Sequence, residues 1–191
     1  MTKYVGGIDA GSNTVKVVIL ADKEVVSYSI LKTGSNSIQA AKDALTNTLN
    51  DVGIPFGKLN YLVSTGYGRN YISFVQESIT EISCHAKGVH YLFPKVRTII
   101  DIGGQDSKAI YLDHGGNVED FVMNDKCAAG TGRFLEVIAA ALNVDLEKMG
   151  DESLKADGEV QISSTCTVFA ESEVVSHVAR GESRSAIIAG I

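Results

Sequence analysis

Two segments of the sequence share one pattern, in which an apolar run ends in an aspartate, a glycine-bearing turn follows, and a second apolar run begins. The first segment is Gly7–Thr14, with the sequence GIDAGSNT, and Lys16 follows it. The second is Asp101–Lys108, with the sequence DIGGQDSK. Such runs and turns are typical of hairpins. A chain that repeats this pattern is predicted to fold into two similar lobes that face each other across a cleft.

The elements around the two turns repeat in a similar order. The first round is predicted to hold strands at Val5–Asp9, Lys16–Leu20, Val25–Thr33 and Tyr61–Ser64 and a helix at Ser37–Asp51. The second is predicted to hold strands at Thr98–Ile102, Lys108–Leu112 and Val118–Met123 and helices at Gly132–Leu142 and Val168–Val178. Runs of β-branched residues favour strands, and apolar residues three or four positions apart favour helices. We expect an α/β fold with lobes at residues 1–95 and 96–191, each a mixed sheet flanked by helices.

The composition is that of an ordinary globular protein, because 45% of the 191 residues are hydrophobic and 21% are charged. The net charge of −6 gives no reason to expect nucleic acid or an anionic membrane as a partner. The longest apolar runs, such as Val15–Ala21, are too short to span a bilayer, and no signal peptide is visible. Three widely spaced cysteines do not suggest a disulfide framework. We therefore expect a cytoplasmic protein.

The two turns supply candidate residues for binding a nucleotide. Asp9 and Asp101 end buried strands, where a carboxylate commonly faces a hydrated Mg²⁺ beside a phosphate. Gln105 is a candidate to orient a hydrolytic water. The candidate phosphate-binding residues are Gly11, Ser12, Asn13, Thr14, Lys16, Gly103, Gly104 and Lys108. One Asp-x-Gly turn is usually only a hairpin, but two of them, each followed by a lysine, favour phosphate binding.

Two of the cysteines have similar surroundings. Cys127 follows a polar stretch and precedes Gly/Ala-rich residues and a predicted helix, and Cys166 lies between a Ser/Thr-rich stretch and another predicted helix. A helix N-terminus favours a thiolate or an anionic cluster. Because a [4Fe–4S] cluster usually takes four thiolates, two copies of the chain would supply them from these two cysteines at a twofold axis. A lone cysteine is more often a small buried hydrophobe, and Cys84 fits that description.

The pair of turns resembles the first and second phosphate motifs of the superfamily that contains acetate and sugar kinases, heat-shock chaperones and actin. This resemblance implies two actin-like (ribonuclease H-like) lobes. It also implies that ATP binds between the lobes and that its hydrolysis is coupled to lobe rotation.

A narrower resemblance rests on five strings: Thr65–Arg69, Cys84–Gly88, Asp101–Lys108, Asn124–Leu135 and Ser163–Glu173. Together they resemble the activator component of 2-hydroxyacyl-CoA dehydratases, to which the ATPase subunits of benzoyl-CoA reductase are closely similar. The resemblance implies an oxygen-sensitive homodimer with one [4Fe–4S] cluster, held by Cys127 and Cys166 of both copies. It implies that ATP or ADP with Mg²⁺ drives helix rotation, and that a partner dehydratase or related reductase receives one electron. A ferredoxin or flavodoxin would supply that electron.

The sequence departs from the family at its carboxyl end. The chain stops at Ile191, in what reads as a helix that has barely begun. Family members continue with further helices and strands, including a Gly-Gly motif that packs against the adenosine. We therefore expect a truncated second lobe, and weak or no ATP binding by these residues alone. Two alternatives remain: a small-molecule kinase of the same fold, and a nucleotide-sensing regulatory module whose cysteines bind zinc.

Expectations also follow for other polar residues. Arg69 is either a surface arginine after a turn or a group that approaches a phosphate or the partner protein. Glu171 and Glu173 are expected to be solvated charges favoured by the helix dipole rather than groups beside a cluster. The four histidines have no ligand spacing with each other, so none is assigned to a metal.

Overall fold

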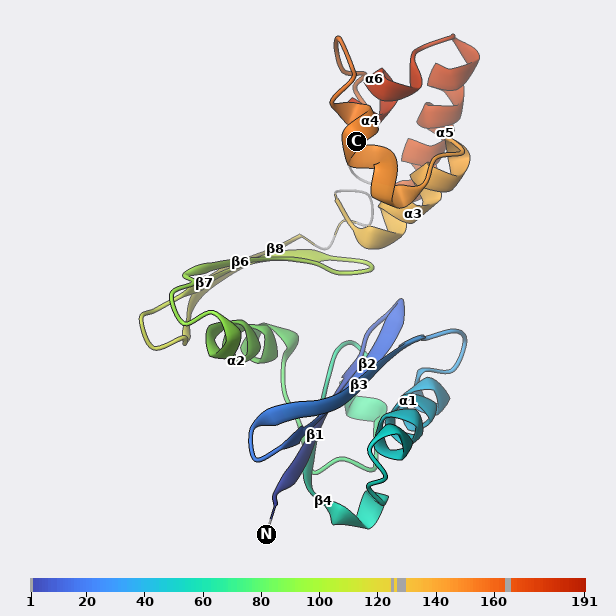
Figure 1. The fold of residues 1–191 in the computed structure, drawn as a ribbon. Coiled ribbons are helices and arrows are strands. Elements are labelled where there is room, and N and C mark those ends of the chain that lie inside the picture. Colours follow the sequence, from blue (N-terminus) through green and yellow to red (C-terminus); the bar gives the residue numbers. More distant parts are fainter. Residues whose placement is uncertain (1, 125, 127–129, 164–165) are drawn as a thin grey trace. The chain divides into compact units, whose positions relative to one another are not determined.

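The computed structural model describes residues 2–124, 126, 130–163 and 166–191 of the chain. The chain divides into two compact units (Figure 1), one formed by Met1–Arg97 with Leu112–Glu119 and the other by Thr98–Tyr111 with Asp120–Ile191. Each unit contains a hydrophobic core of its own. Each can therefore be treated as a separate packing unit.

The first unit is built on a mixed sheet with the strand order β3-β2-β1-β4-β5. Its strands are β1 (Tyr4–Ala10), β2 (Thr14–Ala21), β3 (Glu24–Lys32), β4 (Leu59–Thr65) and β5 (Glu77–Ser78). The β1–β2 and β2–β3 pairs are antiparallel, whereas β4 runs parallel to β1. Because β1 and β4 are parallel neighbours, the loops that follow them leave the sheet at the same edge.

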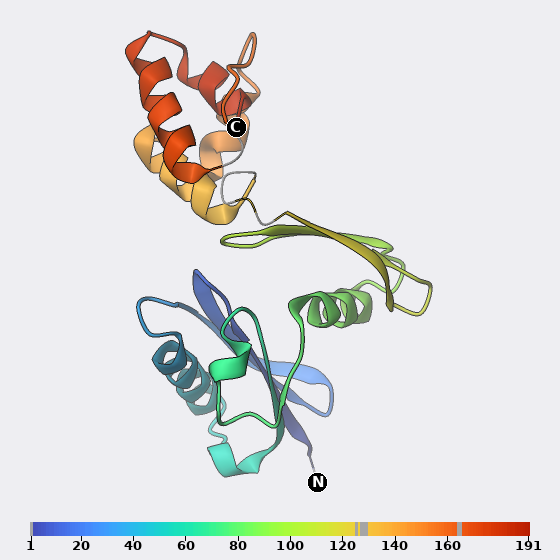
Figure 2. The same ribbon diagram turned by 180° about the vertical axis from the view of Figure 1, so that it is seen from behind.

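Helix α1 (Ser37–Asp51) covers one face of this sheet, as both views show (Figure 1, Figure 2). Asn36 caps the helix, because its side chain accepts a hydrogen bond from the backbone N–H of Gln39 at 3.0 Å. The core between helix and sheet includes Ile8, Val15, Val17, Ile19, Leu45, Leu49 and Leu62. Since side chains alternate along a strand, Asp9 and Lys16 lie on the sheet face opposite α1.

The segment after β4 returns to the end of β1. The 3₁₀ turn Arg69–Tyr71 follows Gly66 and Gly68, and the backbone N–H of Gly68 donates to the carbonyl of Ala10 at 2.9 Å. A further 3₁₀ turn, Phe56–Lys58, precedes β4. Helix α2 (Glu81–Leu92) follows β5. The β4 loop is thus fixed against the first Asp-x-Gly turn.

The second unit combines a small sheet with a group of helices. The strands β6 (Thr98–Ile102), β7 (Ser107–Leu112) and β8 (Val118–Asn124) lie in that order, and β6 and β7 are antiparallel. The helices are α3 (Gly132–Ala141), α4 (Met149–Ser153), α5 (Thr167–Ala179) and α6 (Arg184–Ala189). They share a core of Phe134, Ile138, Leu142, Met149, Ala170, Val174, Ile187 and Ile188. The helices after both Cys127 and Cys166 therefore belong to one packed body.

The predicted elements agree closely with the structure. The predicted bounds of α1 and β6 match at both ends, and those of the other predicted strands and of α3 and α5 match to within two residues. Helices α2 and α4 and the short strand β5 were given no predicted ranges. Helix α6 ends at Ala189 with Gly190 as its C-cap, whereas the sequence suggested a helix that has only begun. Among the described residues, no helix combines the length and apolar character needed to cross a membrane.

Candidate functional site

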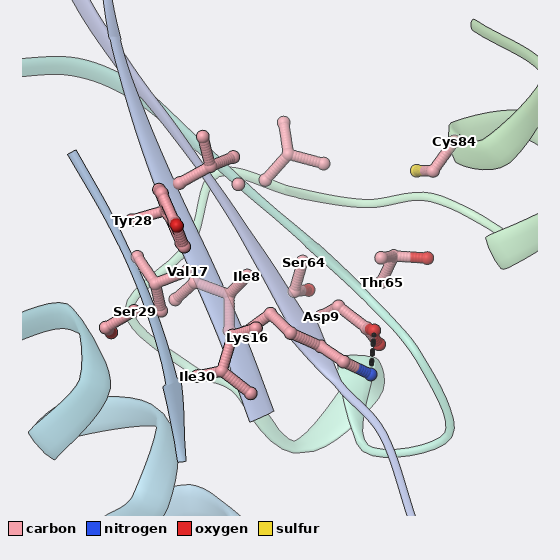
Figure 3. Close-up of a pocket in the computed structure, with 13 residues that line it drawn as sticks. Ile8, Asp9, Lys16, Val17, Tyr28, Ser29, Ile30, Ser64, Thr65 and Cys84 are labelled. Carbon is pink, nitrogen blue, oxygen red and sulfur yellow. Dashed lines mark hydrogen bonds and ion pairs between the residues drawn. The ribbon is translucent and has the colours of Figure 1, made fainter. Parts of the chain in front are cut away.

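The first Asp-x-Gly turn joins β1 to β2 and places Asp9 opposite Lys16. The two residues are partners in the antiparallel register, so their side chains leave the same face of the sheet. Lys16 Nζ lies 2.9 Å from Asp9 Oδ2 (Figure 3), and the two side chains are 45% and 24% exposed. An ion pair this exposed contributes little to folding. Lys16 can therefore leave Asp9 for an incoming anion at low cost.

The other carboxylate oxygen of Asp9 is in a different environment. Asp9 Oδ1 is buried and has no hydrogen-bond partner among the described residues. Gly66, at φ +88°, closes over this oxygen, and a Cβ at Gly66 would lie 2.5 Å from it. A buried carboxylate oxygen without a donor is unusual, and a hydrated divalent cation is a group that satisfies it. The donor set at Asp9 therefore fits Mg²⁺.

The backbone of the first turn is anchored to the end of β3. Thr33 Oγ1 donates to the carbonyl of Gly11 at 2.8 Å, and the Thr33 N–H donates to the carbonyl of Asn13 at 3.0 Å. Gly11 cannot carry a side chain in this conformation, because a Cβ there would lie 2.7 Å from the carbonyl oxygen of Thr14. The predicted phosphate-binding residues Gly11, Ser12 and Asn13 thus form one tight turn that leads into β2 at Thr14, and Thr33 holds its backbone through two hydrogen bonds.

The second turn joins β6 to β7 and repeats the register of the first, with Asp101 opposite Lys108. Here the lysine side chain is only 2% exposed, and its Nζ lies 2.6 Å from Asp106 Oδ1 and 3.4 Å from Asp101 Oδ2. Asp106 is buried as well, at 4% exposed. Lys108 therefore holds two carboxylates together inside the protein instead of facing solvent. Gln105, the predicted water-orienting residue, is exposed.

The carbonyl groups of the second turn accept hydrogen bonds from the start of α3. The N–H of Gly132 donates to the carbonyl of Gly103 at 2.8 Å, and the N–H of Arg133 donates to the carbonyl of Gly104 at 3.0 Å. The first N–H groups of a helix need partners outside the helix, and here the turn provides them. Thr131, which is fully buried, caps the same helix through its hydroxyl. Helix α3 is thus attached by its N-terminus to the second turn.

Cys166 is the N-cap residue of α5 and carries a free, half-buried thiol. Its carbonyl accepts the first helical hydrogen bond, from the N–H of Ala170 at 3.0 Å. Glu173 holds the chain ahead of it, because Glu173 Oε2 accepts a hydrogen bond from the N–H of Ser163 at 2.6 Å. Glu173 is therefore more than a solvated charge. Cys127 lies outside the described residues, and within them no three His, Cys, Asp or Glu side chains group closely enough to hold a metal ion.

Cys84 has a separate setting in α2. It lines a pocket of about 300 Å³ on the sheet face opposite α1, together with Asp9, Tyr28 and Thr65 (Figure 3). Burial raises the pKa of the Cys84 thiol, the neighbouring Thr65 hydroxyl lowers it, and the Asp9 carboxylate raises it again, with a net increase. A thiol with a raised pKa stays protonated at neutral pH. Cys84 therefore carries a neutral thiol beside this pocket, and because it is only half-buried, its description as a small buried residue stays a prediction.

Several residues that shape these sites were given no individual role in the sequence interpretation. Asp106 lies just ahead of β7 and two positions before Lys108, a spacing that places both side chains on the same side of extended backbone, which is a signal that the sequence does carry. Gly66 and Gly132 act through close backbone contacts that no local pattern reveals. Arg69, whose role was left open, donates from Nη1 to the carbonyl of Gly66 at 3.1 Å and so supports the loop over Asp9.

Comparison with known proteins identifies the family. The model of the BadF/BadG/BcrA/BcrD ATPase family matches residues 7–191. The chain belongs to this family. Among its relatives, the activator of lactoyl-CoA dehydratase from Anaerotignum propionicum is 50% identical over 189 residues, which cover 98% of this chain and 73% of that protein. Membership of an ATPase family implies binding of ATP or ADP with Mg²⁺, and ATPase activity.

Two solved structures share the fold. Component A of (R)-2-hydroxyglutaryl-CoA dehydratase from Acidaminococcus fermentans matches with a TM-score of 0.86 at 42% identity, covering 98% of this chain and 73% of that one. The activator of 2-hydroxyisocaproyl-CoA dehydratase from Clostridium difficile, solved with bound ADPNP, matches with a TM-score of 0.85 at 44% identity, covering 98% and 70%. The predicted α/β fold class and the family resemblance are confirmed.

Proposed function

We propose that this chain is an ATP-dependent one-electron donor that reduces a partner 2-hydroxyacyl-CoA dehydratase or a related CoA-ester reductase. The observation that carries the proposal is the half-buried free thiol of Cys166 at the first turn of α5, in the same unit as the second Asp-x-Gly turn. The similarity to dehydratase activators supports the reaction class. A ferredoxin or flavodoxin would supply the electron.

In this proposal, Cys127 and Cys166 from each of two copies of the chain hold one [4Fe–4S] cluster. The N–H groups at the start of α5 favour an anionic ligand beside Cys166. Cys166 supplies only one thiolate, so the other ligands must come from elsewhere. This agrees with a site shared between copies of the chain. When bound, such a cluster supplies a low-potential electron, and its potential responds to hydrogen bonding and solvent exposure.

The helices behind the two cysteines are suited to move together. Phe134 and Ile138 of α3 lie in the same core as Ala170 and Val174 of α5. A close-packed core transmits displacement rather than absorbing it. A shift of α3 would therefore also move α5. The helices that follow both proposed ligands, Cys127 and Cys166, would then move together.

The nucleotide would be handled by the two turns in different ways. Asp9 would hold the hydrated Mg²⁺ through its buried Oδ1, and Lys16 would leave Asp9 Oδ2 for a terminal phosphate. The N–H groups of the first turn would face phosphate oxygens. In the second turn, Asp101 and the exposed Gln105 are the groups proposed to place the attacking water. Lys108 would keep Asp101 in position through their ion pair.

Metal analysis of anaerobically prepared protein tests the cluster. We expect about two iron and two sulfide per chain, a dimer in solution, and a paramagnetic signal after reduction. Cys166→Ala and Cys127→Ala should each lose the iron. Cys84→Ala is the matched control and should keep it, because Cys84 lies in the other unit with a protonated thiol.

Other outcomes would redirect the proposal. Zinc without iron in the wild-type protein would favour a nucleotide-sensing module. A colourless, air-stable protein that transfers phosphate to a small molecule would favour a kinase. An iron-free monomer would rule out the shared cluster and with it the electron-transfer role.

A further inference from the structure

The contact between the second turn and α3 is closer than side chains ordinarily allow. Gly132 is the first residue of α3, and its N–H donates to the carbonyl oxygen of Gly103. A Cβ at Gly132 would lie 3.3 Å from that same oxygen and 3.8 Å from the Cα of Gly104. A residue with a side chain would therefore press on the turn. Glycine allows the helix end and the turn to meet backbone against backbone.

Hydrogen bonds inside the second turn fix the residues that contact α3. The N–H of Gly103 donates to the carbonyl of Asp106 at 2.8 Å, and a Cβ at Gly103 would lie 2.6 Å from Asp106 Oδ1. That same oxygen accepts the buried hydrogen bond from Lys108. Because buried charged groups with good partners are costly to displace, the turn resists local deformation. A force on Gly103 or Gly104 is then passed on to what is bound to their carbonyls.

We propose that Gly132 is a positioning residue that couples the second Asp-x-Gly turn to the cysteine helices. A peptide group has its N–H and carbonyl at opposite edges of one plane. A phosphate seated on the N–H side of the turn would tilt the planes whose carbonyls hold Gly132 and Arg133. Helix α3 would shift, and Cys127 lies only five residues ahead of Gly132 in the sequence. This inference rests on the proposed function, since it assigns the route by which nucleotide reaches the cluster segments.

The coupling predicts a response that can be measured without a cluster. Hydrogen exchange of the peptide that covers residues 130–142 should slow by about fivefold when Mg²⁺ and ADPNP are added, the effect of roughly one additional kcal/mol of local stability. Calorimetric titration of the same sample establishes whether the nucleotide binds. The peptide over α4, which has no bond to the turn, should change less.

Gly132→Pro removes the backbone N–H that donates to the Gly103 carbonyl, while α3 can still form. Proline is well tolerated at the first helical position, and Thr131, with φ −85° and ψ 149°, already has the backbone conformation favoured before proline. Arg184→Pro is the matched control, because Arg184 holds the same position in α6 behind Ser183, at φ −67° and ψ 141°. The exchange response of α3 should vanish in Gly132→Pro and persist in Arg184→Pro.

Each outcome has a consequence. If Gly132→Pro does not fold, Gly132→Ala decides, because it keeps the N–H but presses a methyl group on the Gly103 carbonyl, and a reduced response supports the coupling. A wild-type response in either folded variant overturns it. Nucleotide binding by the wild type without any change in exchange also overturns the inference alone. Absence of nucleotide binding by the wild type overturns this coupling alone, because the metal analysis of the same protein decides the proposed function separately.

Discussion

The two Asp-x-Gly turns begin with one design and differ in how they use their lysine. In each, an aspartate near the end of a strand faces a lysine at the partner position of the next strand. Lys16 is 45% exposed beside one carboxylate, whereas Lys108 is 2% exposed and contacts two. Two positions before the lysine, the second turn has Asp106 where the first has Thr14, and Asp106 is the second carboxylate that contacts Lys108.

The difference in lysine burial suits the two turns to different tasks. A lysine in a solvent-exposed pair can exchange its partner for a ligand, because little energy is lost when the pair separates. A lysine buried between two carboxylates is fixed, because moving it would separate a buried cation from both of them. The first turn is therefore suited to respond to a ligand, and the second to keep its shape and transmit a displacement.

The largest difference between the turns should appear when the lysines are removed. Lys108→Met leaves Asp101 and Asp106 without their shared cation, and breaking a buried ion pair in this way costs about 3–5 kcal/mol. We expect the free energy of unfolding of the second unit to fall by that order. Urea unfolding followed by circular dichroism, with hydrogen exchange to locate the affected helices, measures it.

A second substitution identifies the cause of that loss. Asp106→Asn in the Lys108→Met background removes one of the two carboxylates that have lost the lysine, so the double variant should recover part of the lost stability. If Lys108→Met alone leaves the free energy of unfolding nearly unchanged, Lys108 does not stabilise the second turn, and the contrast with Lys16 fails.

The loop over Asp9 provides the next effect in size. Gly66→Ala forces a Cβ to within 2.5 Å of Asp9 Oδ1 and into a left-handed backbone conformation, φ +88°. Strain of this kind costs about 1–3 kcal/mol, and displacement of the carboxylate should weaken Mg²⁺ binding as well. Thermal unfolding and magnesium titration measure the two effects.

Gly53→Ala is the control for that variant. Gly53 has a similar conformation, φ +65°, but a Cβ there would meet nothing within 4 Å. It should show the backbone strain without any change in Mg²⁺ affinity. Equal effects of the two substitutions on the metal would mean that Gly66 does not shape the Asp9 site.

The parts of this molecule that sequence reasoning predicted are those set by local pattern. The strands around both turns show alternation or runs of β-branched residues, and α1 begins at a polar cap and has helical spacing. The pairing of Asp9 with Lys16 and of Asp101 with Lys108 follows once each turn is read as a hairpin. The glycines of the turns are required by backbone contacts that are close to them in sequence, as at Gly11.

The parts that sequence reasoning missed depend on contacts between distant segments. Gly66 closes over Asp9 only because β4 runs parallel to β1, which brings residues more than fifty positions apart together. Gly132 meets Gly103 only after α3 has docked on the turn. The burial of Lys108 was missed for another reason: Asp106 lies only two positions before it, but its carboxylate was not considered as a partner of the lysine.

Thr33 tests a smaller contribution to the first turn. Thr33→Val deletes the hydroxyl that donates to the carbonyl of Gly11 but keeps the shape of the side chain. Loss of one such hydrogen bond costs about 1 kcal/mol, and the backbone N–H of Thr33 still holds Asn13. Thr46→Val, which removes a hydroxyl from an exposed turn of α1, should cost less. A loss at Thr33 no larger than that at Thr46 would show that the first turn does not depend on the Thr33 hydroxyl.

Lys16 should show the smallest effect on stability and a clear one on nucleotide binding. Lys16→Met removes an exposed pair, so the free energy of unfolding should change by less than about 1 kcal/mol. If the ammonium group moves to a phosphate, however, its loss removes a charge-assisted hydrogen bond, and affinity for the magnesium nucleotide should fall by about tenfold. Lys58→Met, in the Phe56–Lys58 turn, is the matched control and should change neither quantity. Stability and affinity that fall together would place Lys16 in the same class as Lys108, and the division of tasks between the two turns would no longer hold.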